Sequence, residues 1–465
     1  MASQSEGRAY VLGVGMAAFL KPRATRMYTE LAFEAGVKAM LDAHVTYDQV
    51  EAGVACYTSG PTCSGQRAFY QFGMTGIPIY NVNNACATGS TGIHMARNFV
   101  RSGIHDCVLA VGFEQMNSGP LVSSVTDRPT PFDLSMRLMR ATRGADNTPK
   151  NPQMFGNAGR EYMERYGATA DDFAEIARIS HEHSSRNPYA QFQTIYTLKQ
   201  IQKAPMIYYP MTKLQCSPTS DGAAAAVIVS QRFLDARPEL KDHAILIAGQ
   251  ALHSDSPSLY SGSAMDLVGY EMTRAATAAA LAEAGATIDD IKVCELHDCF
   301  SANELISLDA MGFCPKGQAH HLIRSGNITY GGKGPIVNPS GGLISKGHPL
   351  GATGLAQCAE LTWQLRGWAR NGRLVNDVGV ALQHNIGLGG AIVVSVYRRS
   401  DGKTNTASLA TDPEIASLSG LGYNPAVEAR FVTRAQAESV RSRKAPCNYA
   451  LDNTLDLLEG RQGKL

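Results

Sequence analysis

The sequence carries one spaced motif twice, once in each half. It reads C-x-x-G-x-T-G from Cys86 and H-x-x-G-x-T-G from His348. A second pair of similar segments, LDAHVTYDQVE and LAEAGATIDDIK, begins at Leu41 and Leu281. Repetition of this kind predicts two halves of similar structure. If the halves pack about a pseudo-twofold axis, Cys86 and His348 would occupy equivalent helix starts and face one another across one pocket.

Cys86 stands where a strand-like run gives way to a helical pattern. The run GIPIYNV (residues 76–82) is short, apolar and β-branched, as buried strands are, and apolar residues recur at helical spacing from Gly89. Unpaired amides and the dipole at a helix start favour a thiolate. We therefore expect Cys86 to be a nucleophile with a lowered pKa. The alternative is a buried core thiol.

Alternating strand and helix patterns predict an α/β protein. The first half is expected to span residues 1–119 and 216–240. Residues 120–215, richer in Arg, Tyr, Met, Asn and Pro, are expected to form an inserted, mainly helical loop domain. The second half is expected to span residues 241–397. Residues 398–465 are expected to be a polar extension, a linker with one or two short surface helices.

Composition argues against several classes of protein. The formal net charge is +1 and no long basic run precedes the C-terminal tail, so nucleic-acid binding is not expected. The ten cysteines are scattered without a CxxC pair, which is typical of a reducing compartment, and no secretory leader is expected. No apolar run approaches the roughly 20 residues of a membrane span.

Five longer motifs occur in the order known from one family. They are NNACATGST around Cys86, SPTSDGAAAA from Ser217, HDCFSANEL from His297, NPSGGLISKGHPLGATG from Asn338 and ALQHNIGLGGA from Ala381. From about Ala9 to Tyr397 the chain resembles the thiolase family, and within it the thiolase part of sterol carrier protein X. The resemblance implies two βαβαβαββ halves in a five-layer α/β/α/β/α arrangement, with a loop domain over the coenzyme A (CoA) site. It also implies a dimer.

The resemblance further implies a 3-oxoacyl-CoA thiolase that cleaves its substrate with CoA through an acyl-cysteine. Cys86 would be acylated, and His348 would be the base for Cys86 and a donor to the thioester oxygen. CoA would be a co-substrate, and no permanently bound cofactor is expected. Arg and Lys residues of positions 120–215 are expected to contact the CoA phosphates.

Two motifs depart from the common family pattern. His297 replaces an asparagine that holds an oxyanion-hole water, and its imidazole N–H would donate to the enolate oxygen. The usual C-terminal CxG motif reads HNI here, so its acid/base cysteine is absent. Cys299 is the predicted acid/base, with a pKa near its ordinary value of about 8.5, and His384 is the runner-up. The backbone N–H groups of Cys86 and Ile386 would form the second oxyanion hole.

Three other interpretations each agree with part of the sequence. A zinc cluster would use Cys294, His297, Cys299, His348 and His384, but these lack the paired spacing of structural zinc sites, so no metal is expected. A retro-aldolase acting on CoA-linked steroid side chains is the second, although such thiolase-like proteins lack the nucleophilic cysteine. The third is a non-enzymatic acyl-CoA or lipid-binding protein. For that, the segment after Tyr397 is too short and too polar to form a lipid-transfer domain of about 100 residues.

The last three residues, Gly463-Lys464-Leu465, are similar to the SKL-type peroxisomal address, with Gly in place of Ser. They predict recognition by the peroxisomal import receptor and a role in peroxisomal fatty-acid or sterol side-chain β-oxidation. Without such import the protein would be cytoplasmic.

Overall fold

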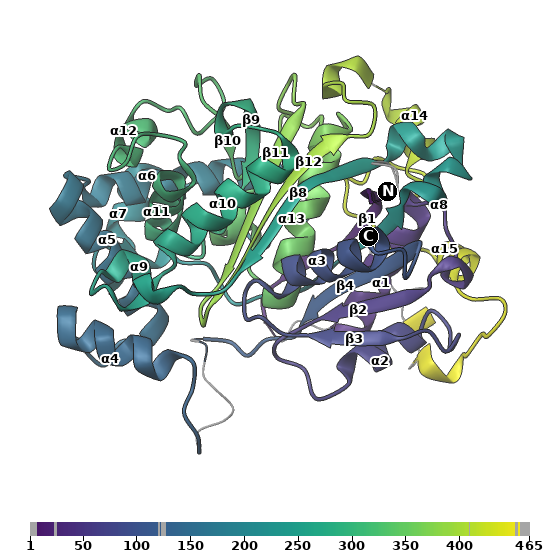
Figure 1. Cartoon of the computed structure of the whole chain (residues 1–465), viewed down its shortest axis with the longest axis horizontal. Coiled ribbons are helices and arrows are strands. Elements are labelled where there is room, and N and C mark those ends of the chain that lie inside the picture. The colour runs from purple at the N-terminus through teal and green to yellow at the C-terminus, as the bar shows by residue number, and fades with distance from the viewer. Residues whose placement is uncertain are drawn as a thin grey trace.

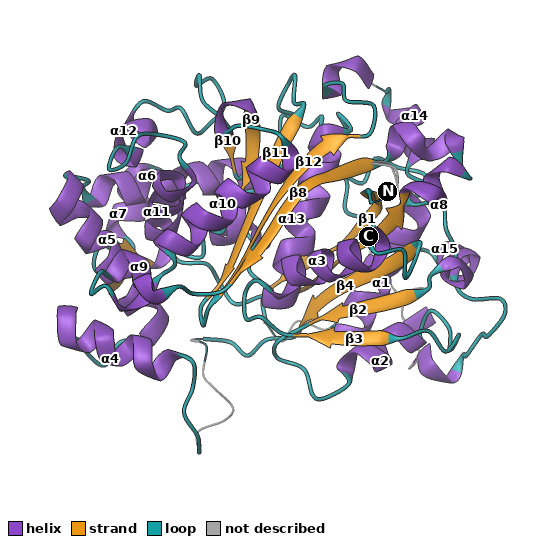
Figure 2. Cartoon of the chain, viewed as in Figure 1, coloured by secondary structure: helices purple, strands orange, loops and turns teal. Residues whose placement is uncertain are grey.

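The computed structural model describes residues 7–22, 26–119, 121, 127–408, 410–451 and 454–455, so the predicted C-terminal address lies outside the described residues. A ten-stranded sheet runs through the molecule in the order β10-β9-β11-β12-β8-β1-β7-β4-β2-β3 (Figures 1 and 2). Its two sets of five strands come from the two halves of the chain. They meet where β1 and β8 pair antiparallel, with Tyr10 opposite Leu246.

Both halves have the order βαβαβαββ, which confirms the predicted fold class. The first comprises β1 (Ala9–Leu20), α1 (Tyr28–Asp42), β2 (Ala52–Cys56), α2 (Ser64–Tyr70), β3 (Ile79–Val82), α3 (Thr88–Arg101), β4 (Cys107–Glu114) and β7 (Asp221–Ser230). The second comprises β8 (Ile245–His253), α10 (Tyr270–Ala284), β9 (Ile291–Glu295), α11 (Ser301–Met311), β10 (Ile336–Val337), α13 (Leu350–Leu365), β11 (Val380–Gly387) and β12 (Ala391–Arg399).

Three hydrophobic cores lie between the layers, one around the central helices α3 and α13 and one on the outer side of each half. Along β1, Val11 faces the central core and its neighbours Tyr10 and Leu12 face an outer one, because successive side chains of a strand point to opposite faces. Helices α3 and α13 lie in the central layer and contact strands of both halves, while α1 and α10 cover the outer faces. A Cβ atom on Gly354 of α13 would lie only 2.2 Å from Ser90 Oγ of α3. Glycine therefore allows these two helices to touch.

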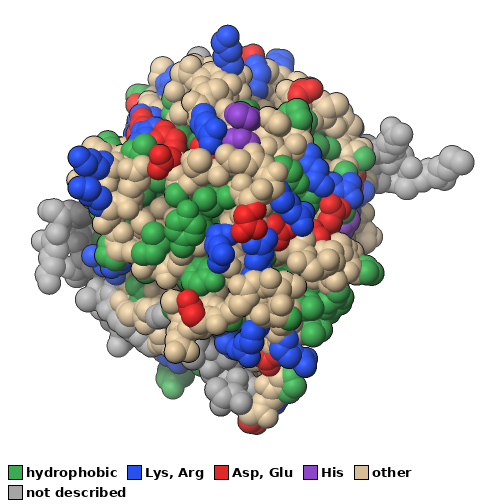
Figure 3. Space-filling view, turned by 90° about the vertical axis from the view of Figure 1, so that its left-hand side faces the viewer, with side chains coloured by type: hydrophobic (Ala, Val, Ile, Leu, Met, Phe, Trp, Pro, Cys, Tyr) green, Lys and Arg blue, Asp and Glu red, His purple; other side chains and the backbone are tan. Residues whose placement is uncertain are grey.

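The chain between β4 and β7 is mainly helical. It contains α4 (Phe132–Arg143), α5 (Lys150–Tyr166), α6 (Ala170–Ser184), α7 (Leu198–Lys203) and the short strands β5 (Met206–Tyr208) and β6 (Met211–Thr212). These helices pack on the second half, where the rings of Phe155 and Phe300 lie 4.9 Å apart. Figure 3 shows that acidic and basic side chains are interspersed on this side of the molecule. The domain boundaries given above stay a prediction.

Shorter helices complete the described chain, namely α8 (Gln231–Asp235), α9 (Ala264–Leu267), α12 (Ala319–Arg324), α14 (Asp412–Leu418) and α15 (Arg434–Val440). None of the helices in the described part of the chain is long and apolar enough to cross a membrane.

Two expectations about burial are wrong. The strand predicted to be buried is β3, which lies at one edge of the sheet beside β2 and leaves Tyr80 37% exposed. Its apolar pattern indicates a strand but does not specify a neighbour on each side.

The C-terminal extension is no surface linker, since Ile415 joins the central core and Val440 joins the outer core of the first half. Its few apolar residues are placed where they fill those cores.

Candidate active site

The repeated motif places Cys86 and His348 at equivalent positions. Each stands two residues before a helix of the central layer, α3 or α13. In both helices the motif threonine donates its hydroxyl to the carbonyl oxygen four residues earlier, Thr91 to Ala87 and Thr353 to Pro349. Because α3 and α13 pack against each other, the two helix starts converge.

A cysteine and two histidines meet at this point. The sulfur of Cys86 and one ring nitrogen each of His297 and His348 all lie within 4.8 Å of one another. The two imidazole rings are perpendicular, with centroids 5.0 Å apart and an interplanar angle of 83°. Cys86 is half-buried, and both histidines are buried. A thiol, a potential base and a potential hydrogen-bond donor therefore form one cluster.

One ring nitrogen of His348 has no hydrogen-bond partner among the described residues. Its Nδ1 lies 2.7 Å from Thr353 Oγ1, and its backbone N–H donates to Ser220 Oγ at 2.9 Å. Its Nε2 is buried and makes no hydrogen bond within the described part of the chain. Burial, aided by the nearby charge of Lys346, lowers the pKa of His348 to about 3. The ring is therefore neutral at physiological pH and can accept a proton.

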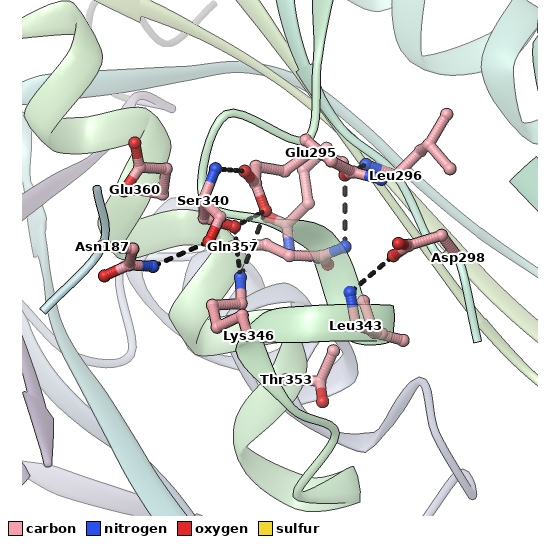
Figure 4. A network of polar contacts seen from close by, with 12 residues as sticks. Asn187, Glu295, Leu296, Asp298, Ser340, Leu343, Lys346, Thr353, Gln357 and Glu360 are labelled. Atoms are coloured by element: carbon pink, nitrogen blue, oxygen red, sulfur yellow. Dashed lines mark hydrogen bonds and ion pairs between the residues drawn. The ribbon is translucent and has the colours of Figure 1, made fainter. Parts of the chain in front are cut away.

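A buried polar network supports the segment that leads to His348 (Figure 4). Lys346 ends the π-helical turn Gly342–Lys346, and its ammonium group lies 3.2 Å from Glu295 Oε2 and 2.7 Å from Ser340 Oγ. At the start of the same turn, Asp298 accepts a hydrogen bond from the Leu343 N–H at 2.6 Å. The carboxylates that flank His297 in sequence thus hold the turn that precedes His348.

His297 is held on its other side by β11. Asn385 Nδ2 lies 2.9 Å from His297 Nδ1, and the His297 backbone N–H donates to His384 Nδ1 at 3.3 Å. Burial, followed by the proximity of His348 and His384, lowers the pKa of His297 well below its ordinary value. A neutral imidazole in this position can donate one hydrogen bond, as the predicted role requires.

The expected low pKa of Cys86 is wrong for the free thiol. Burial, with the negative charge of Glu114 as the next contribution, raises the pKa of Cys86 to about 12. The backbone N–H at the helix start acts in the opposite direction but is the smaller influence. Desolvation of a thiolate therefore outweighs the helix start, and Cys86 must lose its proton to a base when it attacks.

Cys299 is buried at the start of α11, and its expected ordinary pKa is also wrong. Burial raises the pKa of Cys299 well above its usual range, and the neighbouring Cys86 and Asp298 raise it further. Cys299 follows His297, which faces Cys86, by two residues. Cys299 is thus a protonated thiol on the loop of His297, suited first to give a proton.

The HNI triplet lies beside the two segments that carry His297 and Cys86. His384 is fully buried, accepts from the His297 N–H through Nδ1 and lies 3.2 Å from Thr273 Oγ1 through Nε2. Both ring nitrogens are thereby engaged, so His384 supports the His297 loop. Ile386 is buried, and at the next residue a Cβ atom on Gly387 would lie 2.2 Å from Asn84 O. The end of β11 therefore touches the loop that carries Cys86.

The metal interpretation involves a smaller group than the sequence suggested. Within the described residues, Cys86, His297 and His348 form the one set of potential ligands close enough to share an ion. Cys294, Cys299 and His384, which the zinc interpretation also used, lie outside that set. Its three members are the predicted nucleophile and the two histidines that face it.

Sequence reasoning missed the residues that orient the histidines. Thr353 belongs to the repeated motif, and Asn385 lies between the two residues of HNI that have predicted roles. A signal was present in both cases. A threonine five residues after a histidine at a helix start, and an asparagine in a strand end beside a second histidine, are hydrogen-bonding partners that the spacing allows.

Comparison with known proteins defines the class. The family described as "Thiolase, N-terminal domain" matches residues 10–232, and "Thiolase C-terminal domain-like" matches residues 255–398. Sterol carrier protein 2 of Bos taurus is 48% identical over 430 residues, which cover 91% of this chain and 79% of that protein. The solved structure titled "Ltp2-ChsH2(DUF35) aldolase" has a TM-score of 0.69 at 25% identity and covers 85% of this chain and 98% of that one.

Human mitochondrial 3-ketoacyl-CoA thiolase in complex with CoA is also similar in fold. Its TM-score is 0.62 at 18% identity, over 85% of this chain and 98% of that one. The family matches support an acyltransferase-type enzyme. The chain belongs to the thiolase family.

Proposed function

We propose that this protein is a 3-oxoacyl-CoA thiolase, an acetyl-CoA C-acyltransferase. The observation that carries the proposal is the position of Cys86, whose sulfur lies within 4.8 Å of one ring nitrogen of His297 and of His348. The unpartnered Nε2 of His348 supports its assignment as the base. A protonated thiol beside a neutral imidazole can react as a nucleophile when the proton moves to the ring in the transition state.

In the first half-reaction, Cys86 attacks the 3-oxo carbonyl carbon and its proton passes to His348. The resulting oxyanion would be held by the backbone N–H groups of Cys86 and Ile386. The Cα–Cβ bond then breaks, and its electron pair moves onto the acetyl-CoA fragment as an enolate. His297 and protonated His348 donate hydrogen bonds to the enolate oxygen. Cys299 gives its proton to Cα, and acetyl-CoA leaves.

In the second half-reaction, CoA enters as the co-substrate. Cys299, now a thiolate, takes the proton of the CoA thiol. The CoA sulfur attacks the acyl group on Cys86, and the product is an acyl-CoA shortened by two carbons. His348 returns its proton to Cys86. We further propose that cationic side chains of residues 120–215 contact the CoA phosphates.

Acyl labelling tests the nucleophile. After incubation with a simple acyl-CoA and digestion, mass spectrometry should find the acyl mass on the peptide that contains Cys86. The label should disappear in Cys86→Ser. A panel of straight-chain, 2-methyl and sterol-derived 3-oxoacyl-CoAs, followed for release of acetyl-CoA or propionyl-CoA, would then define the substrate class. A label on another residue, or normal turnover by Cys86→Ser, would contradict the proposal.

Retro-aldol cleavage is the second candidate, and the similarity to a solved aldolase favours considering it. That reaction requires neither CoA nor an acyl-enzyme. Cleavage of a CoA-linked β-hydroxyacyl substrate without CoA and without a label on Cys86 would therefore identify it. Tight acyl-CoA binding with no turnover of either substrate type would instead favour a lipid-binding role.

We propose a homodimer as the assembly. The exposed edge of the sheet supports it, because β3 ends the ten-stranded order and Tyr80 is 37% exposed there. An open strand edge is a ready pairing surface. Light scattering during gel filtration should give twice the mass of the 465-residue chain. A monomer at micromolar concentration would contradict this.

We also propose import into peroxisomes through Gly463-Lys464-Leu465, where the enzyme would act in fatty-acid or sterol side-chain β-oxidation. A fluorescent fusion that leaves the C-terminus free should collect in peroxisomes. Deletion of the three residues should abolish that pattern. A diffuse signal that the deletion does not change would contradict the targeting proposal and leave the enzymatic one intact.

A further inference from the structure

The side chain of Asn385 connects His297 to the central helices. Its Nδ2 lies 2.9 Å from His297 Nδ1, and its Oδ1 lies 2.9 Å from Ser90 Oγ. The amide group is fully buried. The two ends of an amide are nearly alike in size, so which end faces His297 is decided by the other hydrogen bonds in the network. That orientation determines which nitrogen of His297 carries the proton.

The network has a fixed direction because it starts at a backbone carbonyl. Gly354 O can only accept, and it lies 2.6 Å from Gln383 Nε2, while Tyr397 OH donates to Gln383 Oε1 at 2.6 Å. The same Nε2 lies 2.8 Å from Ser90 Oγ and 3.3 Å from Gln357 Oε1, so its second hydrogen is directed to the nearer acceptor, Ser90 Oγ. The Ser90 hydroxyl therefore has its own hydrogen left for Asn385 Oδ1. Asn385 must then turn its amide nitrogen toward His297.

We propose that Asn385 is a positioning residue that holds His297 in the tautomer protonated on Nε2. Nδ1 of His297 accepts from the amide and must be unprotonated, so the single ring proton of the neutral imidazole is on Nε2. The Gly354 carbonyl fixes the orientation of the Gln383 amide, and through Ser90 this in turn fixes the orientation of the Asn385 amide. The catalytic meaning of the assignment rests on the proposed thiolase function, but the assignment itself depends only on the hydrogen bonds.

His348 is held in the opposite tautomer by a shorter chain. The Thr353 hydroxyl donates to Pro349 O at 3.1 Å and so must accept from His348 Nδ1 at 2.7 Å. The proton of neutral His348 is therefore on Nδ1, and its Nε2 has a free lone pair. Two facing histidines thus have different roles, because one presents a hydrogen and the other a lone pair to the pocket.

The difference between the tautomers of His297 and His348 couples ionisation of Cys86 to assembly of the oxyanion hole. At rest, His297 is the single imidazole donor, and His348 can only accept. When Cys86 gives its proton to His348 Nε2, that nitrogen becomes a donor as well. The enolate oxygen then meets two N–H groups, and the second of them is made by the proton that the nucleophile lost. His297, already protonated on Nε2, does not compete as a base.

Nuclear magnetic resonance tests the tautomer directly. In the full-length protein labelled with ¹⁵N-histidine, multiple-bond correlations distinguish a protonated ring nitrogen from an unprotonated one. The His297 signals are those that disappear in His297→Asn. We expect Nε2 to be protonated in the wild type. In Asn385→Asp an ionised carboxylate can only accept, so at a pH where this group is ionised the proton should be found on Nδ1. Nδ1 protonation in the wild type would overturn the proposal.

A matched control uses a second asparagine beside a histidine. Asn98 Nδ2 lies 3.0 Å from His94 Nε2 on the exposed side of α3. Asn98→Asp makes the same chemical change away from the pocket. It should alter the signals of His94 and leave both His297 and turnover unchanged. A shift of the His297 signals in this variant would show that the assay reports general disturbance, which would overturn the assignment to Asn385.

Kinetics separate positioning from a structural role. Loss of one oxyanion donor lowers kcat by about 10²–10³-fold, and we expect a loss of this size in Asn385→Asp with a smaller change in KM. In the His297→Asn background the same substitution should cause no further loss, because its effect acts through His297. An equal loss in both backgrounds would overturn the proposal. If Asn385→Asp does not fold, the wild-type spectrum still decides.

The two proposals fail in different ways. Absence of thiolysis together with the expected tautomer would refute the proposed function and leave the inference about Asn385 standing. Thiolysis together with a wild-type His297 protonated on Nδ1 would do the reverse.

Discussion

Replacing Lys346 by Met should strongly destabilise the folded protein. The ammonium group lies 3.2 Å from Glu295 Oε2, and the exposed fractions of the two side chains are 1% and 0%. Removing one member of a buried ion pair leaves the other charge without compensation in a medium that solvates it poorly. Such changes cost about 3–5 kcal/mol of unfolding free energy. Lys292→Met is the matched control, because its pair with Asp377 is 2.8 Å long but exposed.

The loss of unfolding free energy in Lys346→Met should also depend on pH, and its direction follows from the protonation of Glu295. Burial already raises the pKa of Glu295, and the charge of Lys346 is the largest influence against that rise. Without Lys346 the pKa of Glu295 in the folded protein rises further above its value of about 4.3 in the unfolded chain. The folded variant then holds a proton that the unfolded chain has released. Its stability therefore falls as pH increases above about 4.3, by up to about 1.4 kcal/mol per pH unit, until the folded pKa is passed.

Urea unfolding followed by tryptophan fluorescence measures this effect. Trp363 and Trp368 are the two tryptophans of the chain and are 1% and 2% exposed, so their emission should change on unfolding. We expect the gap between wild type and Lys346→Met to be larger at pH 8 than at pH 5.5. The double variant Lys346→Met/Glu295→Gln should recover part of the loss, because the amide is neutral. Equal stability of Lys346→Met and Lys292→Met at pH 8 would refute the reasoning.

Three further predictions concern the site and the central helices. The rate of acylation of Cys86 should be independent of pH from about 5 to 8, because the pKa of His348 is lowered to about 3 and that of Cys86 is raised to about 12. A rate that falls below about pH 6.5, the ordinary histidine pKa, would contradict this. Cys299→Ala should keep acyl labelling but slow α-proton exchange of acetyl-CoA in deuterated water by about 10²–10⁴-fold, and exchange at the wild-type rate would move the acid/base role elsewhere. Gly354→Ala should lower the unfolding free energy in urea by about 1–3 kcal/mol, since its Cβ would lie 2.2 Å from a side-chain oxygen of α3, whereas Gly379→Ala, with 3.5 Å of space, should have little effect.

The sequence alone predicted an α/β protein with two similar halves and the pairing of Cys86 with His348, whereas the five-layer arrangement came from the family resemblance. The first two depend on local patterns, since strand and helix periodicity and the repeated C/H-x-x-G-x-T-G motif are properties of neighbouring residues. A pseudo-twofold axis brings equivalent helix starts together only where the helices lie close to that axis, as α3 and α13 do in the central layer. The position of the second histidine, His297, came from the family resemblance and agrees with the cluster that it forms with Cys86 and His348.

Tertiary structure decided the electrostatics of the site and the surroundings of its residues. Desolvation depends on every atom around a group, so no local pattern could show that burial outweighs the helix start at Cys86 or raises the pKa of Cys299. Burial of the C-terminal extension was hidden for the same reason, because Ile415 and Val440 fill cores built by residues far away in the chain. The proposed tautomer of His297 depends on hydrogen bonds between segments nearly 300 residues apart, such as Ser90 to Asn385 at a separation of 295. Such contacts exist only once the two halves have packed.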